Sequence, residues 1–509
     1  MQDNTNTKRI AKNTLMLYFR QILIMFVSFY TVREVLNVLG VEDYGIYNVV
    51  AGVVTMFSFL SGTMATASQR YFSFALGEKN QEKLYKIFIS NLIIYIIIIL
   101  IAVILFETIG LWFVDTRLKV PVHRFKAVYI LYHFVFFTFV FSIITAPFMA
   151  IIIAHEDMHV YAYFSILEAL LKLIVVFMLK LVVFDKLVLY GFLTFCVAIV
   201  NVLLYLTYCL KKYDECKFRK RYLDVNLIKE MTGFTGWTLF GQISSISRNQ
   251  AVTILLNQTF NPVVVTARGL AVTIANYVNI FANNFNTGIY PAIIKEYASG
   301  NNHRMMRLVF KGCKMTSFLI WIFTLPLILQ MENILKFWLK SVPLYTVLFT
   351  KLALVEVLIT SLSMPITTAA RAPGNMKVYE LILGSLQLLV FVFSYILLNM
   401  NFEAYWVFIV AIGVNFIMFF VRLIIVKFLV DLKIVLFMKA VFSPVIFTIT
   451  VSFLISYFFC CYTPDTLFFI FIKFLFSIFT SFLCIFYIGM TKLERFNFIS
   501  MITRKIKKI

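Results

Sequence analysis

The stretch from Leu39 to Lys83 decides the fold class of this protein. It opens with the polar corner Leu39-Gly40-Val41-Glu42-Asp43-Tyr44-Gly45-Ile46-Tyr47 and continues as an almost uncharged apolar run. It closes on Arg70-Tyr71 and a second corner, Ala75-Leu76-Gly77-Glu78-Lys79-Asn80. The apolar run is long enough to cross a bilayer as a helix. Glycine at each corner allows the tight or left-handed backbone of a turn. The stretch therefore predicts a membrane-spanning helix between two glycine turns.

Composition extends this prediction to the whole chain. Of its 509 residues, 61% are hydrophobic and only 14% are charged, whereas a soluble domain has roughly 25% charged residues. The mean hydropathy is +0.91. The sequence therefore predicts an all-α polytopic membrane protein. The net charge of +22 would suggest nucleic acid in a soluble protein, but cytoplasmic loops of membrane proteins are basic anyway, so we expect no nucleic-acid partner.

Apolar runs between polar corners predict about fourteen transmembrane helices. The expected spans are 14–38, 46–69, 88–114, 128–153, 160–180, 188–210, 234–256, 263–290, 309–330, 344–369, 378–399, 404–427, 436–459 and 467–489. The seven cysteines show no metal-ligand spacing, and most of them are expected in spans as small apolar residues. We therefore expect no disulfide, no metal site and no cofactor.

Lysine and arginine in the loops predict the orientation. With both termini in the cytoplasm, inner segments hold 30 of these residues and outer segments hold 9, as the positive-inside rule requires. The run after Lys8, Arg9 and Lys12 is too long for a signal-peptide core and is expected to stay as the first span. The outer connection 115–127 is an exception, because it is basic; we expect it to contact outer headgroups.

Two short matches indicate an internal repeat. Pro147 and Pro365 are each followed eleven residues later by Met-x-Val-Tyr, and Ala75-x-Gly77 matches Ala298-x-Gly300, at offsets of 218 and 223 residues. Six predicted spans separate the copies, so both halves face the same way, as in transporters built from parallel repeats. The expected organisation is a six-helix bundle, a basic cytoplasmic linker, a second six-helix bundle, and an extra helix pair with a basic cytoplasmic tail, over residues 1–210, 211–230, 231–430 and 431–509.

The corner Leu-Gly-x-x-Asp-Tyr-Gly-x-Tyr at 39–47, with Arg70 ending the second span, resembles the polysaccharide-export branch of the multidrug/oligosaccharidyl-lipid/polysaccharide exporter superfamily. The chain is most similar to O-antigen or capsule repeat-unit flippases of Bacteroidetes, and the likeness in span number covers nearly the whole chain. The resemblance implies an undecaprenyl-pyrophosphate-linked oligosaccharide as substrate, a location in the bacterial inner membrane, and partner proteins of polysaccharide synthesis.

Ionisable residues within spans are the candidate site residues, because they are costly there. Arg248, near the middle of the seventh span in a run of Ser, Asn and Gln, is the first candidate for binding an anionic substrate; a structural arginine bonded to those neighbours is the alternative. Arg268, Arg20 and Arg70 are further substrate-binding candidates. Arg20 can instead snorkel to the surface, and positive-inside bias alone can explain Arg70.

Amides and carboxylates complete the set of candidates. Asn276, Asn279 and Asn283 share one helical face, which is typical either of a hydrophilic cavity wall or of hydrogen bonds between helices. Glu356 and Glu168 are candidates for ion coupling. Glu168 and Lys172 are four residues apart and can instead form a neutralising pair. Lys351 and Glu356 are five apart, which leaves Glu356 freer for coupling.

Three functions are compared, and the lipid-linked substrate of the first is what the resemblance implies. The first is a flippase that moves lipid-linked repeat units to the periplasmic leaflet by alternating access. The second is a cation-coupled multidrug exporter of the same superfamily, for which an acidic cavity is expected, whereas these spans are net basic. The third, a membrane enzyme, is disfavoured because outer loops are short and Gly-x-Ser-x-Gly, Walker and Asp-x-Asp motifs are missing from the sequence. The chain is therefore expected not to be an enzyme.

Overall fold

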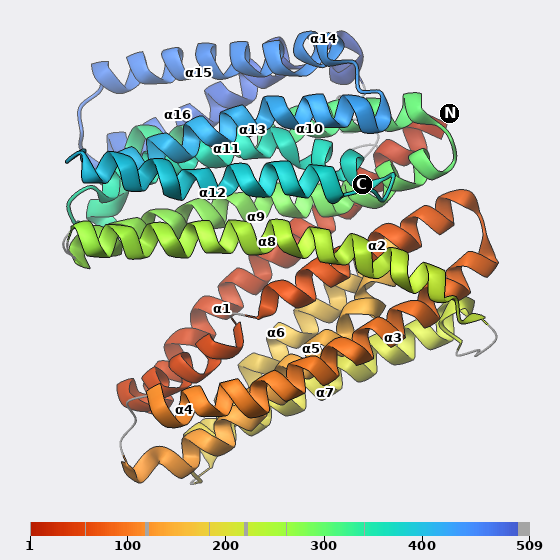
Figure 1. The fold of residues 1–509 in the computed structure, drawn as a ribbon. Coiled ribbons are helices and arrows are strands. Elements are labelled where there is room, and N and C mark those ends of the chain that lie inside the picture. Colours follow the sequence, from red (N-terminus) through yellow and green to blue (C-terminus); the bar gives the residue numbers. More distant parts are fainter. Residues whose placement is uncertain are drawn as a thin grey trace, which may run out of the picture. The chain divides into compact units, whose positions relative to one another are not determined.

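The computed structural model describes residues 2–55, 57–117, 122–182, 184–217, 222–260, 262–339 and 342–496. All regular structure in these ranges is helical (Figure 1). The main helices are α1 (Gln2–Thr55), α2 (Ser58–Glu78), α3 (Gln81–Leu105), α4 (Leu111–Arg117), α5 (Phe125–Ala154), α6 (Met158–Leu181), α7 (Lys186–Lys212), α8 (Val225–Thr259), α9 (Pro262–Ala298), α10 (Asn302–Trp338), α11 (Thr346–Arg371), α12 (Lys377–Asn399), α13 (Trp406–Val430), α14 (Ile434–Phe437), α15 (Ser443–Tyr462) and α16 (Leu467–Cys484).

Helices are the expected elements, since a bilayer core offers no water to satisfy backbone groups. Among the described residues, twelve helices are long and apolar enough to cross a membrane. The two remaining predicted spans, 46–69 and 234–256, fall on the end of α1 with α2 and on α8. Apart from a turn at Phe57, the described residues of these segments are helical too, but Ser, Thr, Gln and Arg make the segments more polar than the rest. The chain is thus an all-helical, multi-pass membrane protein.

The corner at 39–47 differs from its prediction. α1 continues in helical form to Thr55, and only Gly40 leaves the helical conformation, with φ 79° and ψ 171°. Gly40 therefore bends a long helix and does not lie in a loop. At the second corner the left-handed residue is Lys79, with φ 56°, and not Gly77. Asn80 then caps α3 by accepting a hydrogen bond from the Lys83 amide at 3.0 Å.

The chain divides into two compact units. One comprises Arg9–Leu239 and the other Phe240–Ile509 with Met1–Lys8. Each unit repeats the same order of packing: α2 on α5, α5 on α7 and α6 on α7 in the first correspond to α9 on α11, α11 on α13 and α12 on α13 in the second. Pro147 and Pro365 lie at matching places, in the last third of α5 and of α11. The predicted domain boundaries themselves stay a prediction.

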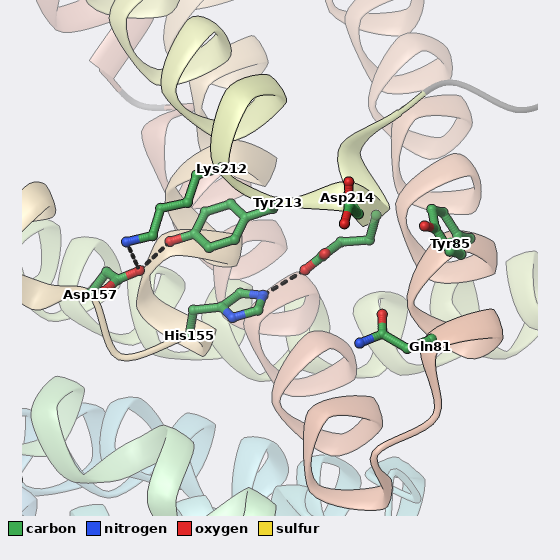
Figure 2. Close-up of a pocket in the computed structure, with 8 residues that line it drawn as sticks. Gln81, Tyr85, His155, Asp157, Lys212, Tyr213 and Asp214 are labelled. Atoms are coloured by element: carbon green, nitrogen blue, oxygen red, sulfur yellow. Dashed lines mark hydrogen bonds and ion pairs between the residues drawn. The ribbon is translucent and has the colours of Figure 1, made fainter.

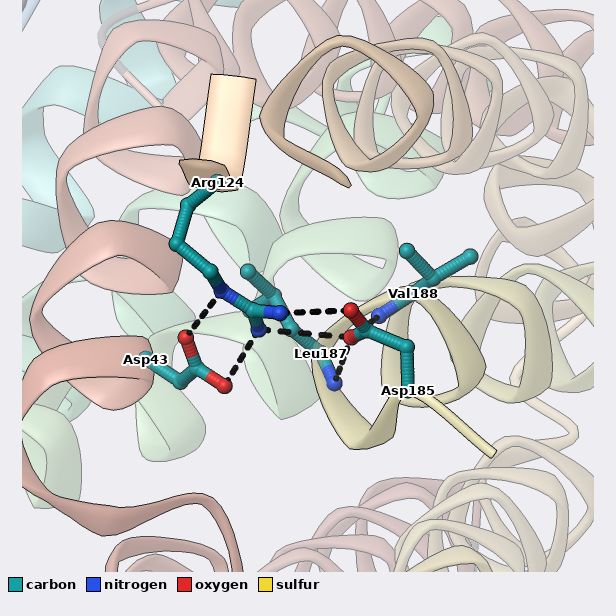
Figure 3. A network of polar contacts seen from close by, with 5 residues as sticks. All are labelled: Asp43, Arg124, Asp185, Leu187 and Val188. Carbon is teal, nitrogen blue, oxygen red and sulfur yellow. Dashed lines mark hydrogen bonds and ion pairs between the residues drawn. The ribbon is translucent and has the colours of Figure 1, made fainter. Parts of the chain in front are cut away.

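Arg124 ties three helices of the first unit together (Figure 3). Its guanidinium donates to both carboxylate oxygens of Asp43 on α1, at 2.9 and 2.5 Å, and to Asp185 at 2.5 and 3.3 Å. Asp185 in turn accepts from the amides of Leu187 and Val188 and so caps α7. The connection that the sequence predicts on the outer side therefore contributes an internal ion-pair network at Arg124, where headgroup contact was expected.

The extra helix pair belongs to the second unit and packs on α10. α15 and α16 contact α10, where the Trp321 indole N–H donates to Ser452 Oγ at 2.8 Å. Lys473 is only 2% exposed and pairs with Asp465 at 2.6 Å. At the end of the pair, Glu494 accepts from Lys314 at 2.6 Å. One of these polar bonds lies within the helix pair and two connect it to α10; such groups are costly to leave unpaired in lipid, so the bonds fix how the pair docks.

Candidate functional site

A helical hairpin places Arg268 beside the α8 segment that carries Arg248. α8 ends at Thr259 and α9 begins at Pro262, so residues equally far from these two ends can become neighbours. Thr253 and Arg268 are such a pair, and Arg268 Nη1 donates to Thr253 Oγ1 at 2.5 Å. Arg248, one turn and a half before Thr253, lies within electrostatic range of Arg268. The second unit therefore brings two of the predicted arginines together.

Glu356 on α11 is the carboxylate of this cluster. Its Oε1 accepts from Arg248 Nη1 at 3.0 Å and from Asn415 Nδ2, on α13, at 2.9 Å. The Arg248 and Glu356 side chains are only 13% and 18% exposed. Helix packing thus supplies Glu356 with a partner, Arg248, other than Lys351, and its predicted role in ion coupling stays a prediction. Two guanidinium groups against one carboxylate leave the cluster with a net positive charge.

The asparagine row on α9 continues this polar surface. Asn276 and Asn283 are exposed and Asn279 is half-buried. These amides lie within a helix that is apolar enough to span a membrane. An exposed amide in that position is stabilised where it faces water or another protein group, and not where it faces lipid tails. The row is thus a hydrophilic face of α9, and its predicted role in substrate binding stays a prediction.

Arg20 lies in a separate cavity of the first unit. The cavity has a volume of about 340 Å³ and is lined by Arg20, Ser165, Glu168 and Lys172 among others. Arg20 is 8% exposed, donates to Ser165 Oγ at 3.4 Å and lies over the Tyr161 ring at 4.4 Å. Its guanidinium is therefore held inside the bundle by α6 and does not snorkel to the surface.

Glu168 forms the predicted pair with Lys172, at 2.6 Å. It also accepts from Asn201 Nδ2 on α7, at 3.2 Å. In the second unit Asn415, on the matching helix α13, makes the same kind of bond to Glu356. In both bundles a glutamate within a span thus contacts an asparagine amide and a cation. Both predicted coupling residues are ion-paired in this conformation.

Arg70 is enclosed by aromatic rings. It is 3% exposed, and its guanidinium lies 4.5 Å from the ring centroid of Tyr71 and 5.0 Å from that of Phe74. Glu230, at the start of α8, is 3.9 Å away. Cation–π contact of this kind stabilises a buried guanidinium. Arg70 is not among the residues that line the Arg20 cavity.

A second pocket, of about 570 Å³, is lined by residues of α3, the α5–α6 connection and the end of α7 (Figure 2). His155 Nε2 and Glu215 Oε1 are 2.5 Å apart, and Asp157 Oδ2 accepts from Lys212 at 2.8 Å and from Tyr213 at 2.5 Å. Burial opposes ionisation of Asp157, but these two donors outweigh it and lower its pKa. Burial and the neighbouring carboxylate raise the pKa of Tyr213.

Sequence reasoning missed Glu380 on α12. Its side chain is 8% exposed and lies against the backbone of Gly241 on α8, where an added Cβ would be 2.0 Å from Oε2. Glu380 is the third residue of the predicted span 378–399. At a span end the sequence pattern does not separate an interfacial carboxylate from a buried one. The only available signal is an acidic residue inside an otherwise apolar run.

Comparisons with known proteins agree with this architecture. The model of the family described as "Polysaccharide biosynthesis protein" matches residues 10–296, more than half of the chain. A search with this chain found no match among curated protein sequences.

Solved transporters share the fold. An outward-facing multidrug resistance MATE family transporter of the MOP superfamily superposes with a TM-score of 0.73 at 13% identity, over 84% of this chain and 96% of the other. A MOP superfamily transporter from Pyrococcus furiosus, whose binding pocket is described as having reverse polarity that suggests a different function, gives 0.72 at 14% identity, over 84% and 96%. A mutant of the Vibrio cholerae MATE transporter VcmN gives 0.65 at 14% identity, over 84% and 98%. Identities this low establish the fold alone.

Proposed function

Because the chain belongs to the polysaccharide biosynthesis protein family and has the fold of MOP superfamily transporters, we propose that it is a flippase for lipid-linked oligosaccharide. Its substrate is an undecaprenyl-pyrophosphate-linked repeat unit of a cell-surface polysaccharide, O-antigen or capsule. It moves this substrate from the cytoplasmic to the periplasmic leaflet of the bacterial inner membrane, with both of its own termini in the cytoplasm. Proteins of polysaccharide synthesis supply and consume the substrate.

The observation that carries the proposal is the net positive cluster of Arg248, Arg268 and Glu356. A guanidinium matches phosphate oxygens with two parallel hydrogen bonds. Arg248 already donates one Nη group to Glu356 and the other to Asn249 Oδ1, at 3.2 Å, so it is held in a fixed orientation. Arg268 adds a second charge from α9. A partly shielded pair of arginines with a single acid favours an anionic headgroup such as pyrophosphate.

The proposed mechanism is alternating access. The bundles 14–210 and 234–427 rock about a central path, the arginines hold the headgroup, and the lipid tail stays in the bilayer. The asparagine face of α9 offers hydrogen bonds to the sugars. Moving negative charge out of a cell whose interior is negative is favourable by about 2.3 kcal/mol per charge per 100 mV, so the membrane potential assists export.

A cation-coupled multidrug exporter is the second candidate, because solved neighbours include a multidrug resistance transporter. The charge balance of the cluster argues against it. Cationic drugs are held by carboxylates, and Glu356 and Glu168 are both neutralised by partners on the protein, Arg248 and Lys172.

The test is translocation of a fluorescent polyprenyl-pyrophosphate oligosaccharide in proteoliposomes. The intact protein is expected to translocate the probe, and Arg248→Gln, with folding checked by thermal unfolding, is expected to lose this activity. Translocation that survives the substitution keeps the flippase proposal but removes Arg248 from substrate binding. No lipid translocation together with sodium- or proton-driven efflux of a cationic dye establishes the drug exporter.

A further inference from the structure

The pocket between α3, the α5–α6 connection and the end of α7 has no part in the mechanism proposed above. Its volume is about 570 Å³, and all of its lining residues belong to the first unit (Figure 2). A cavity of this size accommodates a small ligand. The pocket adjoins the basic linker 211–230, which the sequence predicts in the cytoplasm. A ligand of this pocket is therefore expected to come from the cytoplasmic side.

Two bonded groups fix the polar wall of the pocket. His155 Nε2 and Glu215 Oε1 are 2.5 Å apart. Asp157 Oδ2 accepts from Lys212 at 2.8 Å and from the Tyr213 hydroxyl at 2.5 Å. Among the described residues, these bonds reach only one oxygen of each carboxylate. The Asp157 side chain is 21% exposed, so its second oxygen can accept a hydrogen bond from a ligand, and a side chain already held in place loses little entropy when it does so.

Two stacked pairs of rings give the pocket flat surfaces. The His155 imidazole lies on the Tyr213 ring, with ring centroids 4.3 Å apart and planes inclined by 18°. Tyr85, which lines the pocket from α3, stacks on Tyr222 with centroids 5.0 Å apart and planes inclined by 14°. The face of an aromatic ring is electron-rich and attracts the weakly positive C–H groups of a ligand. The pocket thus combines fixed polar atoms with fixed ring planes.

The second unit forms the matching turn without these side chains. At the offset of 218 residues, His155-Glu156-Asp157 corresponds to Pro373-Gly374-Asn375. The central residue of each turn has left-handed backbone, with φ 63° and 89°, so the same turn forms with and without a histidine and an aspartate beside it. At this offset Val430 also stands where the first unit has Lys212. The polar side chains of the pocket are therefore not a requirement of the bundle fold.

The charges of the lining disfavour one part of the proposed substrate and suit another. The lining carboxylates of Asp157, Asp214 and Glu215 outnumber the cations available from Lys212 and His155. The pocket thus offers no surplus of positive charge with which to bind pyrophosphate. Sugar hydroxyls donate as well as accept hydrogen bonds, and their rings present C–H faces. Carboxylate oxygens beside flat aromatic surfaces match both properties.

We propose that this pocket binds sugar residues of the repeat unit on the cytoplasmic side, before the lipid-linked oligosaccharide enters the transport path. The carboxylates of Asp157 and Asp214 accept from sugar hydroxyls, the Gln81 amide donates and accepts, and the Tyr85 ring packs against the C–H face of a sugar. The arginine cluster of the second unit, and not this pocket, takes the pyrophosphate. The role in recruitment rests on the proposed flippase function, but sugar binding is measured without lipid or transport.

The first measurement is NMR of the full-length protein in lipid nanodiscs, with ¹³C-labelled histidine rings. The probe is the mixture of oligosaccharides that mild acid releases from the lipid-linked intermediates of cells that carry this protein, freed of phosphate. The His155 signal, assigned by its loss in His155→Asn, is expected to shift when the probe is added. His133, which lies outside the pocket on α5, is expected to keep its signal. A stationary His155 signal, or equal shifts of both histidines, overturns the sugar site.

Two pocket variants and a matched control test the lining. Tyr85→Leu removes a ring surface and is expected to weaken binding of the probe by about three- to tenfold. Gln81→Ala removes only an exposed amide, is not expected to disturb folding, and is expected to weaken binding as well. The control is Tyr163→Leu, which removes an exposed ring elsewhere in the first unit and is expected to leave binding unchanged. Unchanged affinity in both pocket variants, or an equal loss in the control, overturns the assignment to this pocket.

Two other ligands are tested with the same His155 signal. Inorganic pyrophosphate is expected not to displace the sugar probe, and a peptide of ten lysines is expected to bind more weakly than the probe. Displacement by pyrophosphate would make the pocket an anion site. Tighter binding of the peptide would make it a docking site for a basic segment of a partner protein. Either result overturns the proposal.

The role in recruitment is measured by translocation in proteoliposomes. Tyr85→Leu is expected to raise the substrate concentration for half-maximal translocation by about three- to tenfold and to keep the maximal rate, because the pocket acts before the bundles rock. An unchanged concentration dependence overturns the recruiting role and leaves the flippase proposal standing. Binding of the sugar probe without any translocation by the intact protein overturns the flippase proposal and leaves the sugar site standing.

Discussion

The guanidinium of Arg248 on α8 lies 3.0 Å from the carboxylate of Glu356 on α11, 108 residues further along the chain. The bond joins the polar α8 to the central helix of the second unit. Arg248 therefore has one observed role, as counter-ion to Glu356, and one proposed role, as ligand for an anionic headgroup. The two roles can be tested separately.

The first prediction separates these roles. Arg248→Gln is expected to lower the free energy of unfolding by about 2 kcal/mol, because it leaves a mostly buried carboxylate without its cation. The double variant Arg248→Gln with Glu356→Gln is expected to recover most of that stability, since neither charge remains. Thermal unfolding in detergent measures both effects.

Translocation by the same variants completes this test. The double variant is expected to stay inactive, because its stability returns while the anion-binding charge does not. Recovery of translocation together with stability would show that Arg248 acts only as a structural counter-ion.

The second prediction concerns Arg268. Arg268→Gln is expected to weaken binding of a polyprenyl-pyrophosphate probe by about tenfold to a hundredfold, as expected for loss of one charge-assisted hydrogen bond. The matched control is Thr253→Val, which removes the hydroxyl that Arg268 contacts and keeps the charge. Equal losses in the two variants would mean that the hairpin contact, and not the charge, matters for binding.

The third prediction concerns the network around Arg124. Arg124→Lys is expected to destabilise the protein by about 1–2 kcal/mol, because an ammonium cannot donate in parallel to Asp43 and Asp185 as the guanidinium does. Lys126→Ala changes an exposed cation near the same helix start and is expected to have little effect. Thermal unfolding of the two variants measures this difference. Similar melting temperatures would show that the bonds from Arg124 to Asp43 and Asp185 add little to stability.

The fourth prediction is a pH dependence that arises from Asp157. Its folded pKa is lowered by Lys212 and Tyr213 against the opposing effect of burial. A lowered folded pKa adds stability above the unfolded pKa of about 3.9, and this stability is lost as the pH falls through the folded value. Asp157→Asn is therefore expected to lower stability at neutral pH and to flatten the acid limb of the stability profile below about pH 4. An unchanged acid limb would exclude Asp157 as a contributor.

Much of the architecture could be predicted from the chain itself. Apolar runs of bilayer length determine helices wherever backbone groups have no water to bond with, and this applies to nearly every predicted span. The match between Pro147 and Pro365 anticipated two bundles with the same packing order. Pairs within one helix, such as Glu168 with Lys172, also follow from spacing alone.

The helix around Gly40 shows where local reasoning stopped. Glycine permits a turn but does not require one, and here it bends a helix that continues to Thr55. The local sequence allowed Gly40 to lie either in a loop or at a bend within a helix, and packing selected the bend.

Only the tertiary structure decided the charge partners between helices. Hydropathy places Arg248, Glu356 and Glu380 at or within spans, but which faces meet depends on helix rotation and on contacts more than a hundred residues apart in sequence. In the folded chain Glu356 pairs with Arg248, whereas the Glu380 carboxyl lies against the backbone of Gly241. The sequence determined that these groups lie in the membrane, because the cost of exposing backbone to lipid is local, whereas the neutralisation of a buried charge depends on which side chain another helix brings to it.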